Sequence, residues 1–164
     1  MKILFIQNRI LFPTNTGGRI RTLNVLRYLA KWHNVTYLCN LEAGEESHCD
    51  AMREVGLKLE TVPWKSPALG DFKFYISLAL NFFSYEPFNV AKDNNPLLRA
   101  RAEELVAQEN YDLVICDFIM MVPIAKDLAC RGSLLFQHNV EAQIFERYAE
   151  TASNWPRRTV MSMQ

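Results

Sequence analysis

The alternation of short apolar runs with amphipathic helical patterns constrains this chain more than any other feature. Five runs of five or six residues predict buried strands, at Lys2–Gln7, Val35–Asn40, Leu57–Val62, Asp112–Asp117 and Ser133–Gln137. Helical spacing predicts helices over Gly18–His33, Glu45–Val55, Pro96–Gln108, Met120–Cys130 and Val140–Glu150. This repetition predicts an α/β fold, a parallel sheet covered by helices on both faces. Such sheets bind ligands beyond the carboxyl ends of their strands.

Glycine, proline and asparagine mark several of the expected boundaries. Gly56 is placed to end the second helix, and Pro63 to end the third strand. Pro96 occupies the first position of its helix, where proline is favoured. Asn139 is expected to cap the last helix.

The segment Asp71–Tyr85 departs from this rhythm, because it is apolar nearly all round and is followed by a loop around Pro87. It is too short to span a bilayer. Two interpretations remain open: burial under neighbouring helices, or an exposed groove or membrane-surface element for a hydrophobic ligand. In the second case Lys65 and Lys73 would face anionic headgroups.

The charges balance overall but not locally. The 164 residues carry 18 basic and 18 acidic side chains, which suits one domain and argues against a general nucleic-acid binder. Residues 1–41 hold six Lys or Arg and no acid, leaving 12 basic against 18 acidic residues in the remainder. This asymmetry indicates either a local anion site or a solvated basic helix face.

The cysteines and the N-terminus bear on location. Four cysteines without a C-x-x-C pair give no disulfide framework and no metal site. The N-terminal apolar run is too short for a signal peptide, and no stretch approaches a membrane-spanning length. We therefore expect a cytoplasmic protein, either free or located at the inner face of the membrane. We expect no cofactor.

The junction between the first strand and the first helix carries two adjacent glycines, Gly17 and Gly18, followed by Arg19 and Arg21. Uncovered N–H groups at a helix N-terminus suit a phosphate or another anion. The junction matches neither a dinucleotide fingerprint nor a P-loop. The alternative is an ordinary flexible turn capped by Thr16.

Two strand ends carry polar side chains. His138 and Asn139 follow the fifth strand, which we expect to be central, and Asp117 ends the fourth. This position favours ligand contact, although a single histidine is more often structural. The sequence contains no nucleophile elbow and no metal-binding histidine pair. The residues alone therefore indicate a ligand-binding α/β domain without a complete catalytic set.

Several motifs resemble the N-terminal, Rossmann-like domain of family-4 retaining glycosyltransferases of the GT-B fold, and the resemblance covers essentially the whole chain. Their order and spacing carry it more than any single motif. They are Phe12-Pro13-x-x-x-Gly17-Gly18-x-x-Arg21, Leu26-x-x-Leu29-Ala30-x-x-His33-x-Val35-Thr36, Tyr111-Asp112-Leu113-Val114-x-x-Asp117, Gln137-His138-Asn139-Val140-Glu141 and Arg147-Tyr148-Ala149.

The resemblance implies a role for each matching position. Gly17 and Gly18 would lie near the donor diphosphate and the acceptor, Arg19 and Arg21 would meet a phosphate, and His138 would touch the donor sugar. The reaction would move a sugar from a nucleotide-sugar donor to a saccharide or lipid-linked acceptor, as in bacterial surface polysaccharide synthesis.

In that family a second domain holds most of the nucleotide-sugar site. We expect this chain to be the single N-terminal domain, with about residues 151–164 as the start of an interdomain segment, and the second domain to be absent. We therefore expect the chain alone to be inactive. The alternatives are a non-catalytic docking subunit of a split transferase and an unrelated phosphate-binding α/β module.

Overall fold

A computed structural model describes residues 1–65, 76, 80–81, 87–137, 140–153 and 158. Five parallel strands form one sheet in the order β3-β2-β1-β4-β5. They are β1 (Lys2–Gln7), β2 (Asn34–Glu42), β3 (Lys58–Trp64), β4 (Leu113–Asp117) and β5 (Ser133–Phe136). The expected α/β fold is confirmed as a Rossmann-like parallel sheet.

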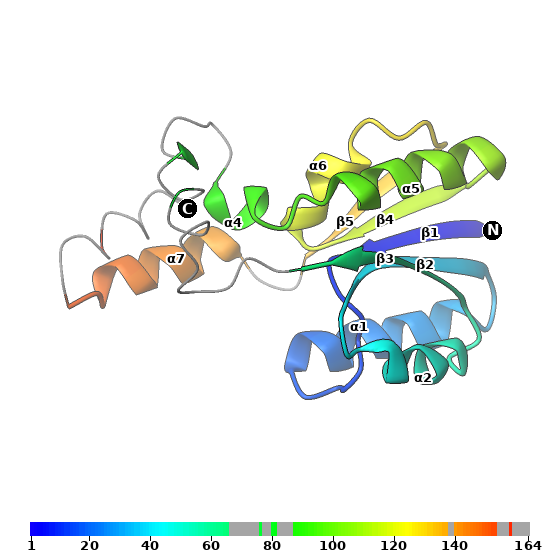
Figure 1. The fold of residues 1–164 in the computed structure, drawn as a ribbon, viewed down its shortest axis with the longest axis horizontal. Coiled ribbons are helices and arrows are strands. Elements are labelled where there is room, and N and C mark those ends of the chain that lie inside the picture. Colours follow the sequence, from blue (N-terminus) through cyan, green and yellow to red (C-terminus); the bar gives the residue numbers. More distant parts are fainter. Residues whose placement is uncertain (66–75, 77–79, 82–86, 138–139, 154–157, 159–164) are drawn as a thin grey trace.

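Helices cover both faces of the sheet (Figure 1). One layer holds α1 (Gly17–Leu29) and α2 (Cys49–Arg53), and the other holds α5 (Pro96–Gln108) and α6 (Val122–Ala125). The short helix α4 (Phe88–Ala91) and α7 (Glu141–Glu150) lie beyond the carboxyl ends of the strands. Two 3₁₀ turns complete the described elements, η1 (Glu46–His48) and η2 (Ile119–Met121).

The core is divided by the sheet into two clusters, as the period-2 geometry of strands requires. Alternate residues of β1 supply both, since Ile3 and Phe5 face α1 while Leu4 and Ile6 face α5. All four side chains are buried. The continuous apolar run that predicted β1 therefore reflects burial on both faces, which is typical of a parallel sheet.

Several expected boundaries differ from the structure. Pro63 does not end β3, because β3 is an edge strand of the described sheet. Alternate N–H groups of an edge strand point away from the sheet, and proline removes no ladder bond at such a position. Gly56 does take a left-handed φ of 89°, although α2 ends earlier, at Arg53. The expected helix Met120–Cys130 is only η2 and α6, because Pro123 has no N–H to continue one α-helix across the junction.

The last helix also corrects two expectations. Its N-cap is Val140, which makes no side-chain cap hydrogen bond, so the predicted capping by Asn139 is wrong. Asn139 itself lies outside the described residues. In addition, β5 is an edge strand of the described sheet and not a central one.

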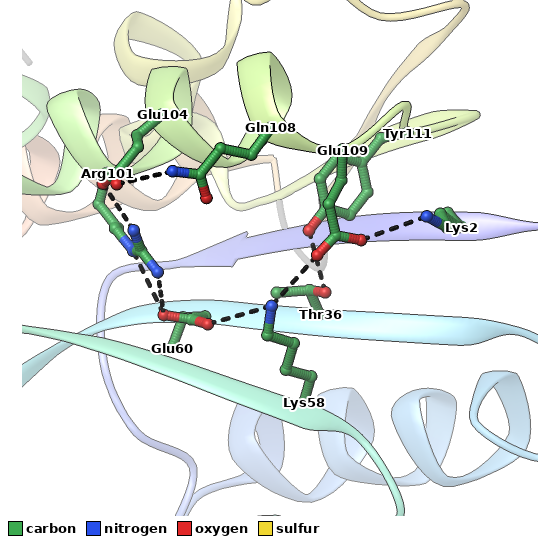
Figure 2. Close-up of polar contacts among 9 residues, drawn as sticks. All are labelled: Lys2, Thr36, Lys58, Glu60, Arg101, Glu104, Gln108, Glu109 and Tyr111. Carbon is green, nitrogen blue, oxygen red and sulfur yellow. Dashed lines mark hydrogen bonds and ion pairs between the residues drawn. The ribbon is translucent and has the colours of Figure 1, made fainter.

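A chain of ion pairs joins the sheet to α5 at the amino ends of the strands (Figure 2). Glu109 pairs with both Lys2 and Lys58, at N···O distances of 3.4 and 3.2 Å. Lys58 also meets Glu60, whose other oxygen binds Arg101 at 2.8 Å. The three cations and their carboxylates are largely paired with one another, so this edge has a structural role in linking β1, β3 and α5.

The segment Asp71–Tyr85 lies outside the described residues except for Ile76, Leu80 and Asn81. Neither interpretation of it is therefore tested. Among the described residues, no helix is long and apolar enough to cross a membrane.

Candidate functional site

The strand order places the candidate site between β1 and β4. From β1 the chain moves outward to β2 and β3, whereas from β4 it moves the other way, to β5. The crevice beyond the carboxyl ends at such a reversal is where open α/β sheets bind ligands. Gln7 ends β1 and Asp117 ends β4, and both face this point.

Asp117 joins three elements at the reversal. Its Oδ2 accepts a hydrogen bond of 2.8 Å from the Thr22 hydroxyl of α1 and one of 3.0 Å from the Gln7 amide of β1. The Gln7 Oε1 in turn accepts from the backbone N–H of Arg9. Asp117 is 0% exposed. This placement suits a residue that fixes the start of α1 against the sheet better than one that touches a ligand.

The N-terminus of α1 lies next to these hydrogen bonds of Asp117. Thr16 is the N-cap, and its hydroxyl accepts from the backbone N–H of Arg19, as the sequence predicts for an ordinary cap. The geometry of an α-helix leaves the N–H groups of Gly17 and Gly18 without a partner inside the helix. The first turn therefore presents two backbone donors and the positive end of the helix dipole at the carboxyl edge of the sheet.

The protein itself does not require glycine at either position. A Cβ at Gly17 would meet no atom within 4 Å, and one at Gly18 would meet Phe118 Cζ at an ordinary 3.5 Å. Positive φ values among the described glycines occur at Gly44 and Gly56 and not here. A positive φ therefore does not explain these two glycines, because both belong to α1.

The two arginines occupy different surroundings. The Arg19 guanidinium turns back to the loop, where it donates to the Pro13 carbonyl at 3.0 Å. The Arg21 guanidinium lies over the Phe136 ring, 5.6 Å from its centroid, and so bridges α1 to the end of β5. The first turn of α1 carries no acidic residue to neutralise them.

Phe118 is a part of the site that sequence reasoning missed. It follows Asp117 directly and has a φ of 67° with ψ of 156°, a region that only glycine enters freely. Its backbone N–H donates to the Phe136 carbonyl at 3.0 Å, which holds the turn in place. Strained backbone of this kind is concentrated at ligand sites. Nothing in the local sequence signals it, since non-glycine residues rarely adopt this conformation.

A second polar group lies at the carboxyl ends of β1 and β2. The Asn95 amide donates to Asn40 Oδ1 at 2.7 Å, and both side chains are buried. Asp93 is also buried, and burial raises the pKa of its carboxyl, partly offset by the charges of Lys92 and Arg9. These residues pack the start of α5 onto β2, and the sequence predicted none of them.

Two of the four thiols are poor nucleophiles. Burial raises the pKa of Cys116 to about 11 and raises that of Cys39 further still. A reactive cysteine needs the opposite shift. In the part of the chain that the structure describes, no three His, Cys, Asp or Glu side chains gather into a possible metal site.

No protein-family model matches the chain, and no curated protein does.

The structure brings together four of the predicted site residues, Gly17, Gly18, Arg21 and Asp117, and places Arg19 beside them. His138 and Asn139 lie outside the described residues.

Proposed function

We propose that this chain is the acceptor-side half of a glycosyltransferase. It would act on a nucleotide-activated sugar and a saccharide or lipid-linked acceptor, with surface polysaccharide assembly as the setting. One observation supports the proposal: the first turn of α1, with two glycines and no acidic residue, lies at the reversal point of a Rossmann-like sheet. The diphosphate of a nucleotide sugar is an anion of the required kind.

The composition of that first turn supports a ligand over a structural explanation. Glycine within a helix costs up to about 1 kcal/mol relative to alanine. Packing requires glycine at neither Gly17 nor Gly18. Basic residues near a helix N-terminus are also unfavourable, yet Arg19 and Arg21 stand there without an acid. A bound anion would explain both features. Glycine lets the anion approach the backbone closely, and the anion would be attracted by the two arginines.

Each residue has a role under this proposal. Gly17 and Gly18 donate backbone hydrogen bonds to the diphosphate, while Arg19 and Arg21 supply positive charge. His138 and Asn139 contact the sugar or the acceptor from the end of β5. Asp117 acts on the ligand indirectly, by holding Thr22 and so the angle of α1.

A second candidate is an unrelated phosphate-binding α/β module. The same first turn favours it, because an anion site is complete without any group that performs transfer. The two candidates differ in the anion that the first turn prefers: a diphosphate under the first, and any phosphate under the second.

Titration of the ¹⁵N-labelled chain with UDP, GDP and inorganic phosphate tests the proposal. We expect the amide signals of Gly17 and Gly18 to shift with a nucleoside diphosphate, and inorganic phosphate to need at least about tenfold higher concentration. Arg21→Gln is expected to weaken binding about fivefold or more, since a charge-assisted contact is lost. Arg27→Gln is the matched control, two turns along the same helix.

Three results would count against the proposal. Unmoved Gly17 and Gly18 signals would remove the first turn from the site. Equal affinity for phosphate and for both nucleotides would support the phosphate-binding module. Equal effects of Arg21→Gln and Arg27→Gln would reduce the interaction to general charge attraction.

A further inference from the structure

The outward face of α1 combines exposed cations with exposed apolar side chains. The core side of this helix is formed by Thr22, Leu23 and Leu26. On the opposite side, spacings of three and four residues align a second set of side chains. Backbone bonds from Lys31 and Trp32 to the last turn of α1 extend this set past the end of the helix. Its members are Ile20, Arg21, Asn24, Arg27, Tyr28, Lys31 and Trp32, which we call the α1 outer face.

The large apolar side chains of the α1 outer face are exposed to solvent. Ile20 is 47% exposed, Tyr28 66% and Trp32 70%. Tyr28 and Trp32 are four residues apart, so their rings lie on neighbouring turns. Large exposed apolar side chains that cluster in this way mark a contact surface. Tyrosine and tryptophan are the side chains that favour the boundary between hydrocarbon and water.

The charged members are all positive. Arg21, Arg27 and Lys31 are exposed, and none of them forms an ion pair within the described ranges. The first acidic residue of the chain is Glu42, so neither the helix nor its flanking loops supply a counter-charge. A uniformly positive face is complementary to an anionic surface.

A shallow, open depression of about 580 Å³ lies along the same face. It is lined by apolar side chains, by Gly17 of the first turn and by Arg21, which is its charged side chain; the apolar residues are Ile20, Val25, Tyr28 and Leu29. The guanidinium of Arg21 would bind the phosphate of a phospholipid, and the apolar lining beside it would contact the start of the acyl chains.

We infer that the α1 outer face binds the surface of an anionic lipid bilayer. The cations meet phosphate headgroups, while Ile20, Tyr28 and Trp32 enter the headgroup region. Because α1 lies flat on its sheet, this contact would set the whole sheet parallel to the bilayer (Figure 1). The α1 outer face shares Arg21 with the first turn of α1, but the inference does not rest on the proposed function, since Arg27, Tyr28, Lys31 and Trp32 lie farther along the chain and the variants below leave Arg21 unchanged.

Vesicle co-sedimentation of the full chain tests this inference. The probes are vesicles of phosphatidylglycerol and phosphatidylcholine in equal parts, and vesicles of phosphatidylcholine alone. We expect binding to the anionic vesicles that falls sharply between 0.1 and 0.5 M salt in the assay, where screening shortens to a few ångströms. Binding to phosphatidylcholine alone should be at least about tenfold weaker.

Two comparisons of variants distinguish binding by the α1 outer face from binding through overall charge or through any exposed apolar side chain. Arg27→Gln with Lys31→Gln should lower the partition coefficient roughly 25-fold, about fivefold for each cation. Lys126→Gln with Arg131→Gln changes the net charge equally on other exposed positions and should have little effect. Tyr28→Ser with Trp32→Ser should lower partitioning about tenfold, whereas Leu97→Ser, at an exposed apolar residue of α5, should not.

Circular dichroism establishes that each variant is folded. The inference is overturned if anionic vesicles do not bind the parent chain, or if both members of a pair weaken binding equally. It is also overturned if sedimentation equilibrium without lipid shows a dimer that Tyr28→Ser with Trp32→Ser dissociates. That result would assign the α1 outer face to a protein contact.

Discussion

The hydrogen bond from Thr22 to Asp117 offers the sharpest test of how the site is built. The Thr22→Val substitution keeps the shape of the side chain and removes the hydroxyl that donates to Asp117 Oδ2 at 2.8 Å. Both residues are 0% exposed, so water cannot replace the lost donor. The buried carboxyl group then retains the Gln7 amide as the other donor to this oxygen that the structure identifies.

The size of the effect follows from this burial. A hydrogen bond to a buried polar group that is left unmade costs about 1–3 kcal/mol in free energy of unfolding. For a chain of this length the corresponding fall in melting temperature is about 3–8 °C. Urea unfolding followed by circular dichroism should show a lower midpoint with an unchanged slope, since the surface exposed on unfolding stays the same.

The control is Thr22→Ser, which keeps the hydroxyl and removes a methyl group. It should cost less than Thr22→Val if the hydrogen bond dominates. A loss below about 0.5 kcal/mol for Thr22→Val, or a larger loss for Thr22→Ser, would refute the anchoring role of Asp117.

Three further predictions concern other parts of the molecule. Gly17→Ala should raise the free energy of unfolding by up to about 1 kcal/mol while weakening nucleotide binding, whereas Gly56→Ala, at a φ of 89°, should lower stability; a loss in both would show that Gly17 is structural. His138→Ala should reduce transfer activity in a complete enzyme more than it lowers the melting temperature, and the opposite pattern would make His138 a core residue. Hydrogen bonds from Lys58 and Lys2 lower the pKa of Glu109, so its contribution to stability is present above its unfolded pKa and lost as pH falls through the folded value. Between pH 6 and pH 3 the free energy of unfolding should therefore fall less steeply for Glu109→Gln than for the parent chain. Equal slopes would show that the ion pairs of Glu109 in Figure 2 do not contribute.

The strands and the long helices could be predicted because their signals are local. Strand β1 and helix α5 have the predicted bounds, since continuous apolar character and Pro96 at the first helical position are properties of the segments themselves. The end of β3 was missed because the effect of Pro63 depends on whether the strand is an edge. Strand order is a property of the whole sheet that no single segment reveals.

The candidate site divides in the same way. Gly17, Gly18 and the arginines could be identified from the sequence, because a helix N-terminus has a local pattern. Thr22 and Gln7 could not, since each is meaningful only through Asp117, which lies 95 and 110 positions further along the chain. The strained Phe118 belongs to this second group, because the sheet holds it in place through the Phe136 carbonyl.

The position of β1 at the centre of the sheet has a consequence for how the protein is made. One edge of β1 pairs with β2, which emerges soon afterwards, but the other pairs with β4, whose residues 113–116 oppose residues 3–6 of β1. At a synthesis rate of about 5–20 residues per second, that edge waits roughly 5–20 s for its partner. During this interval the apolar strand β1 presents free backbone groups along one edge. A nascent chain stalled before residue 113 is therefore the species most exposed to aggregation and to chaperones.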